Sequence, residues 1–317
     1  MKIEKIIPPV DPGLLESELT PDLFVRKTNK GGNEIYIFTH DQAPNLMREV
    51  GRLRELSFRD AGGGTGKSLD IDKYDTAKIP FKQLIVWDPE AKAIIGGYRF
   101  ILGKDNKRDE NNMPVTPTSG LFDISKKFVD KYWNHTIELG RSFVQPAYQP
   151  SVNRKGIFSL DNLWDGLGTI VVDNPDMKYF FGKFTVYPSY NSKARDILYY
   201  FLNKYFPDPE NLITPKYPIA IETPAEELDS YFKWNNYNED YRILLKTLRN
   251  LGEYIPPLVN AYMNLSTTMK MFGTSLNSHF GNVFETAILI TIDDIFEDKK
   301  KRYIDSYINQ LKTASRA

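Results

Sequence analysis

Two apolar runs, residues 81–87 and 93–102, are separated by a short polar turn, and this arrangement constrains the fold more than any other feature. Pro89 ends the first run, because proline cannot continue a ladder of backbone hydrogen bonds. The second run contains the pair Gly96-Gly97, which indicates a β-bulge or the close approach of another backbone. We therefore predict that the two runs form an antiparallel pair of strands.

Further strands and helices flank this pair. Apolar runs bounded by turn residues predict strands, and apolar residues three and four positions apart predict helices. The other predicted strands are residues 34–39, 136–144, 179–187 and 283–292. The predicted helices are residues 44–59, 158–172, 192–206, 226–251 and 294–311, with 256–271 unassigned. This order predicts an α/β fold built on a mixed sheet.

The chain of 317 residues shows no internal repeat and no low-complexity segment, which favours a single domain over residues 1–317. Its predicted parts are an extended N-terminal arm (1–30), a core (35–206), an insertion or elaboration (207–280) and a late strand with a terminal helix (281–317).

Composition restricts the functional classes. The chain has 41 basic and 41 acidic residues, so its overall field does not favour nucleic acid as a partner. It has no cysteine, which excludes disulfides and agrees with a reducing compartment, and only three histidines, so no metal site is predicted. Neither a signal peptide nor an apolar stretch approaching the ~20 residues of a membrane helix is present. We expect a cytoplasmic protein.

Residues 61–68 read AGGGTGKS, which resembles the nucleotide-binding P-loop. That motif needs a buried strand before the loop and a helix after it. Here residues 52–60 carry charges at helical spacing, and residues 69–75 are acidic where phosphates would lie. A flexible loop near a ligand is the favoured interpretation, and a P-loop nucleotide hydrolase remains an alternative.

Charged residues lie within otherwise apolar elements. Arg54 and Phe58 are four residues apart and share one face of a predicted helix, Arg99 lies in the second central strand, and Glu138 and Arg141 lie in a later one. A charge inside a strand is costly unless it is paired or faces a site. Either a salt bridge from Glu138 to Arg99 or Arg141, or a functional site, would account for these residues.

The order and spacing of four blocks match a known family. The blocks are Arg54-x-x-x-Phe58, then Asp70-x-Asp72-x-x-Asp75, then Gly-Gly-Tyr-Arg99, then Glu138-x-x-Arg141-x-Phe143. The series resembles the acyl-homoserine-lactone synthases. It is more similar to their relatives, the ornithine-lipid-type N-acyltransferases that often carry the label hemolysin. Both groups are divergent members of the GNAT acyltransferase superfamily. The synthases carry a tryptophan shortly after the helix phenylalanine, where this chain has glycines, so the lipid-synthesis branch is the better match.

This resemblance covers about residues 35–190 and implies a fold and an activity. The implied fold is a GNAT-like, mostly antiparallel sheet flanked by helices. The implied reaction moves a fatty acyl group from a phosphopantetheine thioester to the amine of an amino acid, in amino-acid lipid biosynthesis. The thioester, acyl-ACP or acyl-CoA, is a co-substrate rather than a tightly bound cofactor. Acyl carrier protein and the amino acid are the implied partners, with peripheral contact to the inner membrane.

The resemblance also implies roles for particular residues. Glu138 would accept the amine proton, with its pKa adjusted by burial and by Arg141. Arg99 and Arg141 would hold the amino-acid carboxylate or orient Glu138. The strand carrying Glu138 is expected to separate from residues 179–187, leaving room for pantetheine, and Tyr187 to protonate the leaving thiolate.

Further binding residues follow from the same comparison. The predicted substrate-binding residues are Arg54, Phe58, Asp72, Asp75, Arg99 and Phe143. The predicted phosphate-binding residues are Arg154, Lys155 and Gly156. Candidates for the fatty-chain channel are Phe143, Phe158, Trp164, Phe180 and Phe184. Two further alternatives stay open: a small-group acetyl-CoA acetyltransferase and a non-catalytic lipid-binding module.

Overall fold

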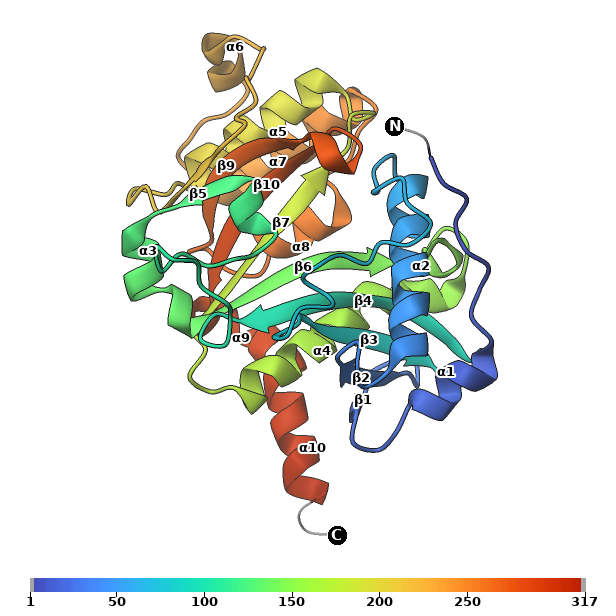
Figure 1. Cartoon of the computed structure of the whole chain (residues 1–317). Coiled ribbons are helices and arrows are strands. Elements are labelled where there is room, and N and C mark those ends of the chain that lie inside the picture. Colours follow the sequence, from blue (N-terminus) through green and yellow to red (C-terminus); the bar gives the residue numbers. More distant parts are fainter. Residues whose placement is uncertain (1–2, 315–317) are drawn as a thin grey trace.

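An eight-stranded sheet organises the computed structural model, which describes residues 3–314 (Figure 1). Residues 1–2 of the predicted arm and 315–317 of the predicted last segment lie outside the described residues. The strand order is β1-β2-β3-β4-β6-β7-β10-β9, and every neighbouring pair is antiparallel except β6 and β7. The predicted mixed and mostly antiparallel α/β fold is therefore confirmed.

The strands of this sheet agree closely with the sequence periodicity. They are β1 Phe24–Lys27, β2 Glu34–Phe38, β3 Lys82–Asp88, β4 Ala93–Leu102, β6 Thr136–Val144, β7 Tyr179–Val186, β9 Lys270–Asn277 and β10 Val283–Thr291. A small second sheet pairs β5 Phe122–Ile124 with β8 Ile213–Pro215. Strands β3 and β4 form the predicted antiparallel pair.

Helices cover both faces of the large sheet. They are α1 Pro12–Glu18, α2 Pro44–Asp60, α3 Lys126–Lys131, α4 Ser159–Asp173, α5 Ser192–Tyr205, α6 Ala225–Ser230, α7 Tyr237–Asn250, α8 Pro257–Met263, α9 Glu297–Lys300 and α10 Ser306–Ala314. A π-helical turn, Lys301–Asp305, joins α9 to α10. Helix α2 lies on one face and α4 on the other (Figure 1).

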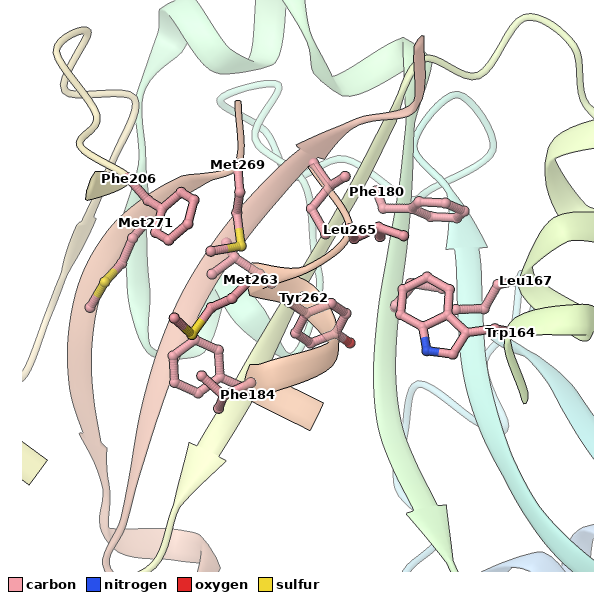
Figure 2. Close-up of a cluster of buried hydrophobic side chains, with 14 of the residues drawn as sticks. Trp164, Leu167, Phe180, Phe184, Phe206, Tyr262, Met263, Leu265, Met269 and Met271 are labelled. Carbon is pink, nitrogen blue, oxygen red and sulfur yellow. The ribbon is translucent and has the colours of Figure 1, made fainter. Parts of the chain in front are cut away.

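Burial of one apolar stripe fixes each helix in place. On α2 the buried residues include Leu46, Val50 and Leu53, which pack with strand residues such as Ile85 beneath them. On the opposite face α4, α5 and α8 share a larger core, part of which Figure 2 shows around Trp164. Removal of these side chains from water supplies the main stabilisation.

Three segments differ from the sequence prediction. The arm over residues 1–30 is not wholly extended, because it forms α1 and the edge strand β1. The single helix predicted over 226–251 is two helices, because Asp240 accepts hydrogen bonds from the backbone of residues 233 and 234 and Asn236 caps α7. The unassigned segment 256–271 contains helix α8 and the start of strand β9, whose polar residues and Gly273 obscure the strand pattern.

Strands β6 and β7 separate partway along their length. They pair only from Thr136 to Glu138 on β6 and from Tyr179 to Phe181 on β7. Beyond that point β7 stays paired with β10 as far as Val186, and β6 stays with β4 as far as Val144. The sheet therefore opens beside Glu138, at the place where the resemblance predicts room for pantetheine.

Candidate active site

A cavity of about 510 Å³ lies where β6 and β7 separate. It has a polar wall and an apolar wall. The charged residues of its lining are Arg99, Glu138, Arg141, Lys183 and Glu285. The apolar lining includes Leu139, Leu160, Leu163, Phe184, Leu258 and Val259. The two walls suit a reaction that joins a polar molecule to an apolar chain.

Glu138 is the buried carboxylate of this cavity, with 2% of its surface exposed. Its Oε1 accepts a hydrogen bond of 2.6 Å from Oγ1 of Thr118. Its Oε2 has no hydrogen-bond partner among the described residues. Burial raises the pKa of Glu138, and Lys183 followed by Thr118 partly offsets that rise. Glu138 thus lines the cavity and keeps one carboxylate oxygen without a hydrogen-bond partner.

Lys183 and Thr118 position Glu138, and the sequence analysis missed both. Nζ of Lys183 donates to Oγ1 of Thr118 at 2.9 Å, so the threonine hydrogen is left to point at Glu138. The same ammonium lies 3.6 Å from a carboxylate oxygen of Glu285. Side chains alternate between the two faces along β7, which places Lys183 on the same face as Tyr187. This alternation is the only signal of these residues in the sequence.

The three arginines of the motif pair with the acidic cluster rather than with Glu138. Arg54 lies 3.2 Å from Asp75, and Arg99 lies 2.9 Å from Asp72 and 3.1 Å from Asp75. Burial opposes ionisation of Asp75, but Arg54 and Arg99 outweigh it and hold the pKa of Asp75 well below its usual value. The salt bridge considered between Glu138 and an arginine is absent among the described ion pairs.

Only some of the predicted substrate-binding residues reach the cavity. Arg99, Phe58 and Phe143 line it, and Nε of Arg99 has no partner among the described residues. Arg54 and Asp75 are fully buried away from the lining and pair with each other and with Gln83, while Nε of Arg54 has no partner among the described residues. Arg54 and Asp75 therefore belong to the ion-pair network and are not in contact with a substrate. Asp72, half-buried beside Arg99, is also absent from the cavity lining.

Arg141 occupies a β-bulge in β6. Gly97 pairs with Phe143 and Arg99 with Gly140, so Arg141 and Ser142 together face one residue of β4. The backbone of Arg141 has φ +50°, which is uncommon for a residue with a side chain and is costly to hold. The guanidinium lies 2.7 Å from Asp70 and 4.4 Å from the ring centre of Phe280, and these contacts stabilise the bulge.

The glycines beside the bulge permit close backbone packing. A Cβ on Gly96 would lie 2.3 Å from the carbonyl oxygen of Phe143, and one on Gly97 would lie 2.6 Å from that of Leu84. No side chain fits at such distances, which explains the pair noted in the sequence.

Tyr187 lies at the end of β7 and lines the same cavity. Burial, followed by the charge of Glu285, raises the pKa of Tyr187 to about 12. The hydroxyl therefore carries its proton at neutral pH.

The predicted phosphate-binding residues precede α4, in a 3-10 turn over Arg154–Phe158. Gly156 lines the cavity, and a Cβ there would lie 2.3 Å from the carbonyl oxygen of Tyr148. Arg154 is exposed. Lys155 is already paired with Asp88 at 3.0 Å and with Glu90 at 2.7 Å, so a phosphate would compete with these carboxylates.

The glycine-rich loop 61–68 donates hydrogen bonds to a carboxylate of the same chain. Glu55, which is fully buried, accepts hydrogen bonds from the backbone N–H of Thr65 and Gly66 and from the hydroxyl of Thr65. The loop follows helix α2 and is not followed by a helix, so the context that a P-loop needs is missing. The nucleotide-hydrolase alternative is therefore rejected.

The five aromatic candidates for the fatty-chain channel divide into two groups. Phe143 and Phe184 line the cavity. Trp164 and Phe180 belong to the core of the α4 face, and Phe158 lines a second pocket, which Trp164 also lines.

Comparison with known proteins agrees with this geometry. The family model described as acetyltransferase (GNAT) domain matches residues 53–157, which include the C-terminal half of α2 and all of β4 and β6. The mostly antiparallel sheet and its opening are consistent with this match.

Two curated relatives are similar over almost their full length. A glycine N(alpha)-acyltransferase of Bacteroides thetaiotaomicron is 56% identical over 96% of this chain and 91% of the relative. A glycine N(alpha)-acyltransferase of Phocaeicola vulgatus is 52% identical over 97% of this chain and 95% of the relative. The chain thus belongs to the GNAT superfamily of N-acyltransferases. No solved structure matches it significantly. Within residues 3–314, no helix is long and apolar enough to cross a bilayer.

Proposed function

We propose that the protein transfers a fatty acyl group from a phosphopantetheine thioester to the amine of glycine, in the biosynthesis of an amino-acid lipid. The single observation that carries this proposal is that Glu138 lines the cavity at the sheet opening and has an Oε2 without a hydrogen-bond partner. The names of the two relatives support glycine as the acceptor. The apolar wall of the cavity supports a fatty chain over an acetyl group.

The proposed reaction is one displacement at the thioester carbonyl. The amine nitrogen attacks the carbonyl carbon, a C–N bond forms and the C–S bond breaks, giving an amide and a thiol. The amine loses one proton to Glu138, directly or through one water. The leaving thiolate gains a proton from Tyr187, whose hydroxyl lies on the cavity wall. Holding the two reactants together lowers the entropic part of the barrier.

The bulge in β6 is suited to stabilise the carbonyl oxygen. A bulge leaves one residue outside the regular ladder, so a backbone N–H near Arg141 is available to point at the developing negative charge. Arg99, with its unpaired Nε, is the proposed partner of the glycine carboxylate. Phe58 and Phe143 close the cavity around the acceptor.

The donor enters between the loop before α4 and the start of α8 in this proposal. Exposed residues such as Gln149, Pro150 and Ile157 line the cavity there, next to Gly156. The exposed Arg154 is the proposed phosphate partner, because the ion pairs of Lys155 leave that residue less available. Donors on acyl carrier protein and on coenzyme A carry the same phosphopantetheine. We place the reaction in the cytoplasm, with peripheral contact to the inner membrane.

Glu138→Gln tests the proposal. With glycine and a palmitoyl thioester on acyl carrier protein or coenzyme A, it should lower the rate of N-acylglycine formation about a hundredfold or more, because general base catalysis is worth roughly that much. Mass spectrometry measures the product and a thiol reagent measures the release of the carrier. Glu110→Gln, an exposed change outside the cavity, is the matched control. A loss below threefold in a folded variant would remove Glu138 from the mechanism and favour a non-catalytic lipid-binding module.

A further inference from the structure

Helix α8 belongs to the elaboration between residues 207 and 280, outside the segment that the acetyltransferase family model matches. Its first residues nevertheless line the cavity that holds Glu138. Pro256, Pro257, Leu258 and Val259 all contribute to the lining. An element remote in sequence from the catalytic strands thus completes the cavity.

Burial along the lining distinguishes the mouth of the cavity from its inner end. Ile157, before α4, and Pro257, the first residue of α8, are exposed and mark the mouth. Leu163, Phe184 and Val259 are each at most 1% exposed and mark the inner end. The inner residues come from α4, β7 and α8, and none of them carries a polar side-chain atom.

The wall at Val259 is backed by closely packed side chains. Tyr262 and Met263, three and four residues further on, lie behind it on the same side of α8 and are buried. The ring of Tyr262 lies 5.9 Å from that of Trp164 on α4, and Figure 2 shows Tyr262 between the diverging strands β6 and β7. A close-packed interior does not yield to an extra methylene without cost.

We propose that α8 limits the length of the acyl chain, with Val259 as the end wall and Leu258 as a side wall. This inference rests on the proposed function, because it requires a fatty thioester in the cavity. An alkyl chain avoids the charged wall around Glu138, since burying those groups against hydrocarbon without a partner is unfavourable. It therefore extends along the apolar wall until it meets α8.

Two substitutions of Val259 test the inference in opposite directions. Saturated thioesters from octanoyl to stearoyl, on coenzyme A and on acyl carrier protein, are offered to the full-length protein with glycine. Val259→Phe should lower kcat/KM for the longest accepted chain about tenfold or more, because each methylene that does not fit is worth roughly that factor. Shorter chains should keep their rates within about threefold. Val259→Ala should shift the optimum to longer chains.

Val172→Phe, at a half-buried valine of α4 outside the cavity, is the matched control and should leave the chain-length profile unchanged. Leu258→Phe, at a half-buried position, repeats the test if Val259→Phe does not fold. The parent protein could acylate glycine while the folded Val259 and Leu258 variants keep its chain-length profile. That result would overturn the role of α8 and leave the proposed function standing. A parent protein that transfers no chain to glycine would overturn both.

Discussion

Glu138 depends on two neighbours that hold one of its oxygens and leave the other free. Thr118 occupies Oε1, and Lys183 fixes the direction of the threonine hydroxyl. The groups that face Glu138 are Lys183 of β7, Arg99 of β4, and Thr116, Thr118 and Tyr74 from the segments between strands, and Glu285 of β10 pairs with Lys183. Among the cations of this set, Lys183 contributes most to keeping the carboxylate ionised.

Lys183→Met should therefore move the pH profile of kcat/KM. The pKa of Glu138 is already raised by burial, and removing the ammonium raises it further, so the rising limb of the profile should shift to higher pH. Activity lost at neutral pH should be partly regained at alkaline pH. Initial rates over pH 5–9 measure the shift.

Thr118→Ser, which keeps the hydroxyl, is the control for that experiment and should leave the profile in place. Lys104→Met removes an exposed lysine paired with Asp176 and controls for the loss of one positive charge. An unchanged acidic limb in Lys183→Met would show that this lysine does not support the ionisation of Glu138.

At the scale of elements, Asp75 joins helix α2 to the sheet. Its carboxylate lies between Arg54 of α2 and Arg99 of β4, and Gln83 of β3 donates a further hydrogen bond to it. Removing one partner of a buried ion-pair network leaves the others uncompensated in a place that water does not reach.

Asp75→Asn should lower the free energy of unfolding by about 3–5 kcal/mol, because two buried guanidinium groups lose their shared carboxylate. Urea unfolding at pH 7 measures the change. The pKa of Asp75 is depressed in the folded protein, so its contribution is present above the unfolded pKa and is lost as pH falls through the folded value. The difference between parent and variant should therefore shrink in strong acid. Asp72→Asn, at a half-buried carboxylate, should cost less.

The sequence predicts elements better than it predicts partners. Apolar periodicity is local, so it located β3, β4, β6, β7 and α2 within a few residues. It also identified Glu138, because a carboxylate inside an apolar strand is visible in the chain itself. The partner of Arg54 was not visible, since a buried arginine can pair with a protein carboxylate or with a substrate. Lys183 and Thr118 lie 65 positions apart, and only the fold brings them together.

At the scale of the whole molecule, the C-terminal third is built into the central sheet. Strand β10 lies between β7 and β9, and its pairing with β7 runs from Phe284 to Thr291. Helix α4 also contacts the last helical segment, where Asp161 accepts a hydrogen bond of 2.7 Å from Tyr303. The first 206 residues thus lack a sheet neighbour and part of their core when taken alone.

The protein should unfold in a single cooperative transition, because one continuous sheet joins the predicted core to the elaboration and the terminal segment. Coincident urea curves from tryptophan fluorescence and circular dichroism would show this. A fragment of residues 1–206 should not fold. Two resolved transitions, or a stable fragment after limited proteolysis, would instead divide the chain into separate domains.

The carboxylate of Glu55 accepts the backbone hydrogen bonds of the glycine-rich loop that a bound phosphate would otherwise accept. The loop is thereby fixed in one shape, and it holds Gly63 so close to Tyr187 that a methyl group on Gly63 would lie 3.1 Å from the tyrosine ring. A sequence that binds phosphate in other proteins here supports one side of the cavity. A motif search that assigned ATP binding to residues 61–68 would therefore mistake a structural loop for a ligand site.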